Sequence, residues 1–261
     1  MAYTRRKIIQ AGLAGAASLF CAPQALGAHS RTLKIVHHQD FAPFEYETDR
    51  KAIGIIPDIL NLAFEGIASY DLTHESLPWK RAQTLVSNGN ADGLTAYASR
   101  DRREYMNFSK TPLIHITPSL FFSASHPRID ELKSISTLND LKQFDVVDLI
   151  GNSWAEETVA PHTPMKWFPE YDQIFKVLLS NRFDVHVALS FEMVKLQLKA
   201  FGYDSDALVS VKIPALIKPV PLYFGLRKSL PGSKNILKAF DEKLEQIKPQ
   251  IKTIKAKHVI A

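Results

Sequence analysis

Cysteine, long apolar runs and clustered positive charge are all scarce in this sequence, and each shortage argues against a class of function. The only cysteine among the 261 residues, Cys21, lies in an N-terminal segment that we expect to be removed. The working chain would therefore have no disulfide, cysteine nucleophile or thiolate metal site. The body of the chain has no long Lys/Arg run, so the composition does not indicate nucleic-acid binding. We also find no internal repeat, no low-complexity segment, and no Ser/His/Asp or two-carboxylate constellation.

The first 28 residues have the layout of an export signal. A basic Arg5-Arg6-Lys7 precedes a mildly apolar run at 8–22, and small residues follow at positions 25, 27 and 28. We predict cleavage near Gly27 or Ala28 and a periplasmic mature protein, and the order from Thr4 to Ile9 resembles a twin-arginine signal. A membrane anchor is disfavoured, because the run is shorter than about 20 residues and is broken by glycine and proline.

Removal of this segment would also change the charge of the protein. It carries three positive charges and no acid, so the net charge would fall from +5 to +2, and the working protein would be less basic than the whole sequence. Cys21 follows Phe20 rather than a small residue, so we expect no lipid anchor. Hydrophobic residues make up 46% of the chain, which is enough for one large or two modest cores.

The stretch from Asp92 to Pro112 carries the most specific local signal. An apolar-leaning run at 92–98 predicts a short strand, and Ser99-Arg100-Asp101-Arg102 predicts a helix with Ser99 at its N-cap. The Ser99 hydroxyl, the first-turn N–H groups and the Arg102 guanidinium would meet at one strand end and form an anion site. The alternative is an ordinary solvated helix cap.

Other segments alternate between strand and helix patterns. We predict strands at 32–38, 145–150 and 184–189, and a strand-like crossing at 113–123. We predict helices that begin near Pro57, run from 77 to 88, cover 171–181, and extend from Ser233 to a kink or end near Pro249. Ser153 and Glu156 have the spacing of a capping box. This alternation favours parallel sheets covered by helices.

Several motifs, in order, resemble the family-3 periplasmic solute-binding proteins, the polar amino acid receptors of ABC importers. The resemblance covers about residues 31–248. It includes Ser99-Arg-Asp-Arg followed by Asn107-Phe-Ser-Lys-Thr-Pro-Leu, where the family has T-P-E-R and then F-S-x-P. It also includes Phe41-Ala-Pro-Phe-Glu-Tyr, Gly54-x-x-x-Asp58, a segment at 137–141, and Gly151-Asn-Ser, where the family has G-S-T.

The resemblance implies a type II periplasmic binding protein fold: two lobes, each a mainly parallel sheet flanked by helices, joined by two hinge strands. We expect lobe one at 31–118 and 220–261 and lobe two at 119–219. It also implies a set of ligand contacts, with Arg102 on a carboxylate and Phe41 stacked over the ligand. The expected contacts are Phe41, Trp79, Thr95, Tyr97, Ser99, Arg102, Asn152 and Ser153.

The sequence departs from the family pattern where an amino acid's ammonium group would be bound. His38 and Leu189 stand at the positions where acids usually serve. An unpaired buried ammonium costs several kcal/mol, so either Glu192 or Asp40 compensates or the ligand is a carboxylate without an amino group there. Phe41, Trp79, Tyr97 and Trp154 suggest an aromatic-rich pocket.

Three functions remain open. The first is a monomeric receptor, without cofactor, that captures a small carboxylate and delivers it to an inner-membrane ABC permease. The second is an enzyme similar to the periplasmic cyclohexadienyl dehydratases, for which Glu192 or His186 would be the general acid. The third is a sensory module for a membrane signalling protein. A metal site at His37-His38 is disfavoured, since neighbouring strand residues point to opposite faces.

Overall fold

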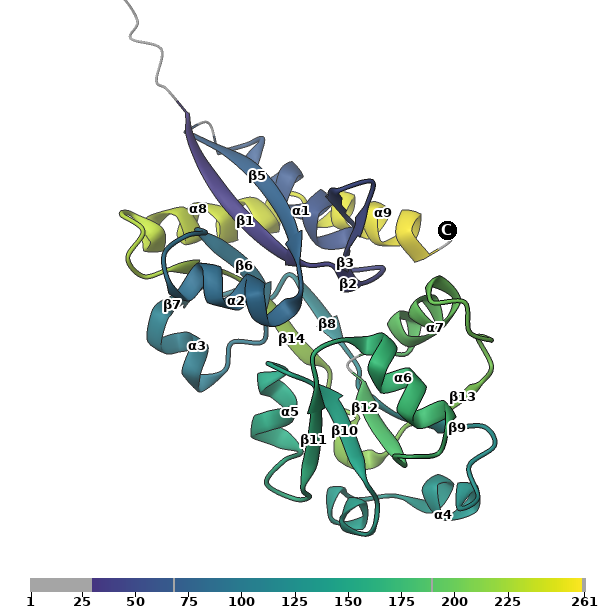
Figure 1. Ribbon diagram of the computed structural model, residues 1–261. Coiled ribbons are helices and arrows are strands. Elements are labelled where there is room, and N and C mark those ends of the chain that lie inside the picture. Colours follow the sequence, from purple (N-terminus) through teal and green to yellow (C-terminus); the bar gives the residue numbers. More distant parts are fainter. Residues whose placement is uncertain (1–29, 68, 189, 260–261) are drawn as a thin grey trace, which may run out of the picture.

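The computed structural model describes residues 30–67, 69–188 and 190–259, which form two α/β lobes one above the other (Figure 1). We call the part built around a six-stranded sheet lobe one and the part built around a five-stranded sheet lobe two. The predicted export signal at 1–28, with Cys21, lies outside the described residues. Among the described helices, none is both long and apolar enough to cross a membrane.

The sheet of lobe one has the order β5-β1-β6-β14-β7, with β8 also paired to β14. The β5-β1-β6 side is parallel, whereas β14 runs antiparallel to β6, β7 and β8. The sheet is therefore mixed, because β14 brings the chain back from the other lobe. Its strands are β1 (Arg31–His38), β5 (Tyr70–Leu77), β6 (Gly93–Ala96), β7 (Met106–Phe108), β8 (Ile114–Ile116) and β14 (Val220–Arg227).

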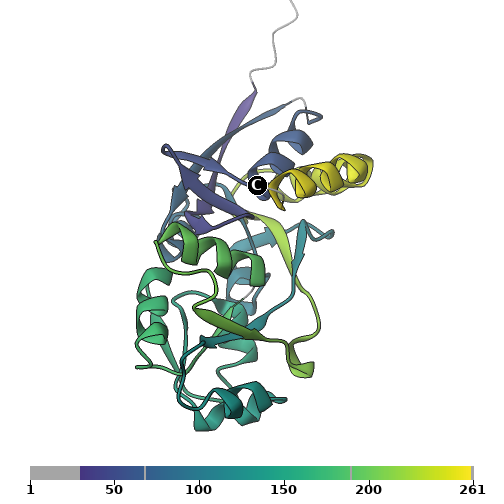
Figure 2. The same cartoon turned by 90° about the vertical axis from the view of Figure 1, so that its right-hand side faces the viewer.

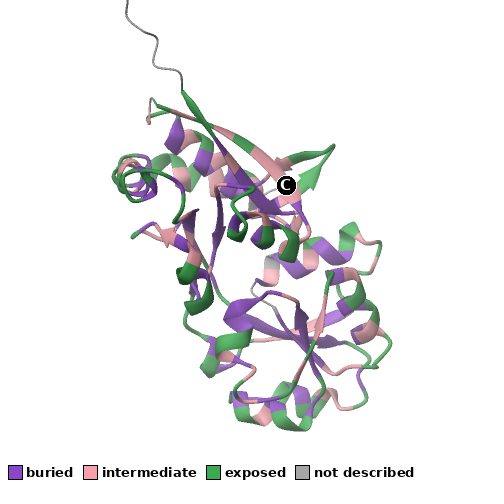
Figure 3. Ribbon diagram, turned by 60° about the vertical axis from the view of Figure 1, so that its left-hand side comes forward, coloured by how far each residue is buried: buried purple, intermediate pink, exposed green. Residues whose placement is uncertain are grey.

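Helices cover both faces of this sheet because successive strand residues point to opposite sides. Ile35 of β1 is fully buried in the main core, and the next residue, Val36, is buried in a second cluster with Val86 of α2. Figure 2 shows the helices beside the strands, and Figure 3 marks the buried residues of both in purple. The helices of lobe one are α1 (Ile55–Phe64), α2 (Trp79–Ser87), α3 (Arg100–Tyr105), α8 (Ser233–Gln246) and α9 (Lys248–Val259).

A small antiparallel sheet of β2 (Asp40–Phe41), β3 (Glu45–Thr48) and β4 (Lys51–Ile53) follows β1 directly. It carries Phe41 and Glu45 to the lobe boundary. Gly54 then joins β4 to α1 with φ of +126°, and a Cβ there would lie 2.6 Å from the Phe44 carbonyl oxygen, so only glycine fits.

Lobe two has the strand order β11-β10-β12-β9-β13, parallel from β11 to β12 and antiparallel around β9. Its strands are β9 (Ser119–Ser123), β10 (Val146–Leu149), β11 (Met165–Phe168), β12 (Val185–Ala188) and β13 (Leu208–Val211). Its helices are α4 (Ile129–Ser134), α5 (Ser153–Thr158), α6 (Tyr171–Leu179) and α7 (Phe191–Ala200), with 3-10 turns η1 (Leu138–Gln143) and η2 (Pro214–Leu216).

Two chain crossings join the lobes, and they run as a pair. β8 leads into β9 and η2 leads into β14, while β8 and β14 are hydrogen-bonded to each other from Ile114↔Leu222 to Ile116↔Val220. The predicted crossing at 113–123 is thus present, but it is divided into two short strands with Pro118 between them. Pro118 has no N–H for a sheet hydrogen bond, which explains the break.

Two local predictions are confirmed and one is wrong. The first helix begins at Ile55, directly after Gly54, so Pro57 lies in its first turn as predicted. At α5, the N-cap is Asn152, whose side chain accepts a hydrogen bond from the Ala155 N–H, so the predicted Ser153 capping box is replaced by a cap one residue earlier. The predicted break near Pro249 is confirmed, because α8 ends at Gln246 and Pro249 lies in the first turn of α9.

Candidate functional site

A cavity lies where the two lobes meet, and its empty space, which includes open solvent, is about 450 Å³. Lobe one contributes the ends of β1 and β6, the β2-β3 hairpin, and residues from α2 and α3. Lobe two contributes the end of β10 and the starts of α5 and α6, and β14 adds Leu222. The lining residues are His38, Phe41, Glu45, Trp79, Thr95, Ala96, Tyr97, Arg102, Leu149, Asn152, Tyr171 and Leu222.

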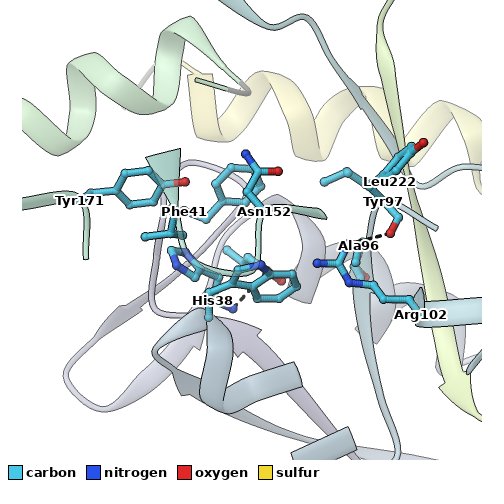
Figure 4. A pocket seen from close by; sticks show the side chains of 12 residues that line it. His38, Phe41, Ala96, Tyr97, Arg102, Asn152, Tyr171 and Leu222 are labelled. Atoms are coloured by element: carbon cyan, nitrogen blue, oxygen red, sulfur yellow. Dashed lines mark hydrogen bonds between the residues drawn. The ribbon is translucent and has the colours of Figure 1, made fainter. Parts of the chain in front are cut away.

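Rings gather around His38 on one side of this cavity, opposite Arg102 (Figure 4). The His38 ring makes edge contacts with Phe41, Trp79 and Tyr171, with centroids 6.1, 5.8 and 5.7 Å away. Burial among these rings lowers the pKa of His38 to about 3, so this imidazole is neutral at neutral pH. Its Nδ1 accepts a hydrogen bond from the Asp40 N–H at 3.3 Å, and the proton therefore sits on Nε2.

Arg102 is buried, with 3% of its surface exposed, and protein groups hold its guanidinium. Nε and Nη2 donate to Gln83 Oε1 at 3.3 and 3.0 Å, and Nη1 donates to the Tyr97 carbonyl at 2.8 Å. The guanidinium also lies 5.2 Å from the Trp79 ring centroid. These acceptors are all neutral, so the positive charge of Arg102 has no hydrogen-bonded counter-charge among the described residues.

The Gly151 carbonyl of lobe two meets three donors from lobe one. Trp79 Nε1, Gln83 Nε2 and Arg102 Nη2 lie 2.9, 3.2 and 2.8 Å from this oxygen. Gly151 has φ of +83°, and a Cβ there would lie 2.6 Å from Gln83 Nε2. A side chain at 151 would therefore have to displace the Gln83 amide while the lobes are in this contact, and the positive φ also favours glycine. Because the three donors and the acceptor belong to different lobes, these bonds hold the lobes together.

Two further hydrogen bonds connect the lobes on either side of the cavity. The Arg100 N–H at the start of α3 donates to Glu157 Oε1 at 2.8 Å. Gln197 Nε2 of α7 donates to the Asp40 carbonyl. The structure is thus a closed arrangement, with the cavity enclosed between bonded edges.

Asn152 is fixed from behind by a buried acid. Its Nδ2 donates to Asp148 Oδ2 at 3.0 Å, while its Oδ1 caps α5. Asp148 is 1% exposed, and burial raises its pKa to about 8, although hydrogen bonds from Leu149 N–H and Asn152 oppose this. The neighbouring His186 donates from Nδ1 to the Val147 carbonyl, and burial lowers its pKa to about 4. Uncharged groups thus support this wall of the cavity at neutral pH.

A chain of hydrogen bonds runs from the cavity to the surface of lobe one. Glu45 Oε2 meets His37 Nδ1 at 2.8 Å, His37 Nε2 meets His74 Nδ1 at 2.8 Å, and His74 Nε2 meets Asn61 Oδ1 at 2.8 Å. The other Glu45 oxygen accepts from the His38 N–H at 3.1 Å. His37 therefore faces the β3-β5 side, whereas His38 faces the cavity, as expected for neighbouring strand residues.

The eight sequence-predicted contacts divide into two groups. Phe41, Trp79, Thr95, Tyr97, Arg102 and Asn152 all line the cavity. Ser99 and Ser153 are not among the described lining residues. Ser99 accepts from the Arg102 N–H as the predicted N-cap of α3, and Ser153 faces a neighbouring hollow beside Gly151 and Arg102. Trp154, which the sequence suggested as an aromatic wall, is 6% exposed and belongs to the core.

Sequence reasoning missed Glu45, Leu149, Tyr171 and Leu222 of the lining, and also Gln83 behind it. Gln83 lies four residues after Trp79 on α2, so its place on the same helix face was predictable from spacing. The others come from strand ends and a helix start in different parts of the chain, which local patterns do not bring together. Leu189 lies outside the described residues, and nothing is described of the Glu192 side chain.

Comparison with known proteins identifies the protein family. The sequence profile described as "Bacterial extracellular solute-binding proteins, family 3" matches residues 33–260. The chain belongs to this family. No curated protein sequence matches it.

Solved structures with the type II periplasmic binding protein fold align over almost the whole described chain. The substrate-binding protein of an amino acid ABC transporter is 17% identical, with a TM-score of 0.69 over 87% of this chain and 99% of that one. A histidine kinase sensor domain similar to periplasmic binding proteins is 17% identical, with a TM-score of 0.71 over 88% and 96%.

A third solved structure, the ancestral amino acid-binding protein AncCDT-1, is described as a precursor of cyclohexadienyl dehydratase. It is 19% identical, with a TM-score of 0.66 over 87% of this chain and 95% of that one. At these identities the three likenesses show a shared fold, the predicted two-lobed type II architecture. They do not distinguish between transport, sensing and catalysis.

Proposed function

We propose that this family-3 solute-binding protein is a periplasmic receptor that captures a small carboxylate between its lobes and delivers it to an inner-membrane ABC importer. The observation that carries the proposal is the buried guanidinium of Arg102, which lines the interlobe cavity and has no acid hydrogen-bonded to it among the described residues. Four of the five guanidinium N–H groups donate to protein acceptors, which leaves one Nη1–H to donate to a carboxylate oxygen. The other proposed contacts are Phe41, Trp79, Thr95, Tyr97 and Asn152.

Capture depends on movement between the lobes, whose boundaries we place at 31–118 with 220–261, and at 119–219. Trp79, Gln83 and Arg102 now share the Gly151 carbonyl, so closure is linked to the same arginine that would hold the ligand. A ligand that contacts both lobes binds the closed form more tightly and shifts the hinge equilibrium towards it. The permease would recognise this closed shape.

The second candidate is a sensory module, which a structural likeness to a histidine kinase sensor domain favours. It would use the same cavity and the same closure, and it would present the closed form to a signalling protein instead of a permease. A pull-down of the ligand-loaded protein from membranes, with the partner identified by mass spectrometry, separates the two candidates.

Thermal unfolding of the processed protein with a panel of L-amino acids, hydroxy acids, keto acids and dicarboxylates tests the receptor function. A ligand at 100 times its Kd adds about 2.7 kcal/mol of stability, which moves the midpoint by a few degrees. We expect this shift in the wild type and in Arg103→Ala, a neighbouring arginine that does not line the cavity, but not in Arg102→Ala. The proposal fails if no small carboxylate gives a shift.

A further inference from the structure

We propose that the ligand is a monocarboxylate with a flat apolar body and a neutral hydroxyl or keto group in place of an α-ammonium. This proposal rests on the receptor function above and narrows its ligand class. It follows from the charges that line the cavity, the arrangement of the rings, and one buried hydroxyl without a partner.

The first step concerns Glu45, the only acid among the described lining residues. An ammonium group would need this carboxylate, but each of its oxygens already has a protein partner. Oε2 bonds to His37 Nδ1 and Oε1 accepts from the His38 N–H, and only 2% of Glu45 is exposed. The carboxylate is therefore directed at β1, and each oxygen has only its remaining lone pair to offer a ligand cation.

The hydrogen-bond chain also holds Glu45 in place. His37 links Glu45 Oε2 to His74, and His74 Nε2 meets Asn61 Oδ1 at the surface of the lobe. Burial lowers the pKa of His74 to about 4, so this histidine is neutral at neutral pH. The Glu45 carboxylate is thus fixed by protein groups of lobe one.

The second step concerns the remaining polar groups of the lining, which are uncharged at neutral pH. His38 is neutral because burial lowers its pKa, and burial raises the pKa values of Tyr97 and Tyr171 above the ordinary tyrosine value. Thr95 and Asn152 carry no charge. Apart from the Glu45 carboxylate, Arg102 is thus the one charged group of the described lining; Glu156 and Glu157 act on it from nearby without a hydrogen bond, and a ligand carboxylate would complement it directly.

The third step concerns shape and the neutral group of the ligand. Phe41, Trp79 and Tyr171 surround His38 edge-on, and this arrangement leaves flat surfaces of the kind that hold planar apolar groups. Thr95 lies in the lining at 2% exposure, and its Oγ1 has no hydrogen-bond partner among the described residues. A buried hydroxyl without a partner is unfavourable, and a ligand hydroxyl or carbonyl would satisfy it.

Four ligands that differ only at the α-carbon test the proposal directly. They are L-phenylalanine, phenyllactate, phenylpyruvate and 3-phenylpropionate, titrated calorimetrically into the processed wild-type protein. We expect phenyllactate or phenylpyruvate to bind at least about 100-fold more tightly than L-phenylalanine, because the ammonium would be buried without a free acid. L-leucine and its 2-hydroxy analogue repeat the comparison on an aliphatic body.

The variant Thr95→Val removes the hydroxyl and keeps the shape of the side chain. We expect it to lose affinity for the hydroxy or keto acid about tenfold and to leave 3-phenylpropionate unchanged, whereas Thr95→Ser retains the preference. Equal losses for all the acids would show that Thr95 only packs, and would overturn its assigned role.

The remaining outcomes separate this inference from the receptor function. If an amino acid binds more tightly than its hydroxy and keto analogues, and this binding depends on Arg102, the inference is overturned while the receptor function stands. Loss of that binding in Glu192→Gln would then identify the acid that holds the ammonium group. If only the aliphatic acids bind, the inference that the ligand has a flat apolar body is wrong. If none of these acids binds but another carboxylate of the thermal panel does, the inference fails and the receptor function stands; if no carboxylate binds, both fail.

Discussion

The substitution Gly151→Ala separates the stability of the fold from the closure of the lobes. Position 151 has φ of +83°, where an alanine costs about 1 kcal/mol in any lobe arrangement. In the closed form its Cβ would also lie 2.6 Å from Gln83 Nε2. The Gln83 amide belongs to the other lobe, so this clash disappears when the lobes separate. The backbone cost therefore acts on folding, and the contact cost acts on closure alone.

The size of the closure effect follows from the bonds that Gln83 makes. If its amide moves away, it loses the bond from Nε2 to the Gly151 carbonyl and the bonds that Oε1 accepts from Arg102. With about 0.5–1.5 kcal/mol for a neutral hydrogen bond and somewhat more for a charged one, and with water replacing part of the loss, closure weakens by about 1–3 kcal/mol. Ligand affinity then falls about 5- to 150-fold.

Single-molecule energy transfer between dyes on the two lobes measures this directly. The only natural cysteine is Cys21, so cysteines introduced at the exposed Ser87 of lobe one and Lys133 of lobe two would be the only labelling sites after processing. We expect Gly151→Ala to reduce the closed fraction, to weaken ligand binding, and to lower the free energy of unfolding by about 1 kcal/mol in urea.

Gly202→Ala is the matched control in the same lobe. Gly202 has φ of +80°, and a Cβ added there would meet no atom of the described residues within 4 Å, so this substitution carries the backbone cost without the contact. The reasoning would be refuted if both variants lost similar stability and Gly151→Ala kept the closed fraction and affinity of the wild type.

Three further predictions concern single groups. Asp148→Asn should flatten the pH dependence of the free energy of unfolding. In the wild type, folded Asp148 keeps a proton that the unfolded chain releases above about pH 4. Wild-type stability therefore falls as the pH rises from about 4 to about 8, by up to about 1.4 kcal/mol per pH unit. His38→Gln should reduce the loss of stability in acid. His38 binds a proton below about pH 6.5 in the unfolded chain but only below about pH 3 in the folded protein. Wild-type stability therefore falls as the pH drops through that range. Urea titrations at several pH values measure both, and unchanged slopes would contradict them. Ser99→Ala should cost about 1 kcal/mol as a lost N-cap and leave ligand affinity unchanged; an affinity loss would restore Ser99 as a ligand contact.

Local patterns were sufficient where one short segment determines the structure. Ser99 caps α3 because a serine before a polar first turn satisfies a free N–H, and the break at Pro249 follows from its missing N–H. The same reasoning failed at α5. Ser153 has the right spacing for a cap, but Asp148, four residues before Asn152, holds the asparagine side chain in the capping position instead. A buried partner on a strand decided between two adjacent candidates.

From the sequence, only the cavity residues that lie in recognisable motifs were predictable. Phe41, Trp79, Arg102 and Asn152 were found because they stand in recognisable segments, and they do line the cavity. Tyr171 was expected only as the first residue of a helix, and its place beside His38 depends on how closely the two lobes approach. That approach is set by long-range contacts such as those to the Gly151 carbonyl, which no local sequence pattern encodes.

The position of β14 constrains the order in which the chain can fold. This strand is the last in the sequence, yet it lies between β6 and β7 in the sheet of lobe one, so that sheet cannot be completed before residue 227 has been synthesised. The five strands of lobe two all lie between 119 and 211. Lobe two can therefore fold on an incomplete nascent chain, whereas lobe one can complete its sheet only after β14 has been synthesised. In a nascent chain, the half of the binding site with Asn152 and Tyr171 would form before the half with Arg102.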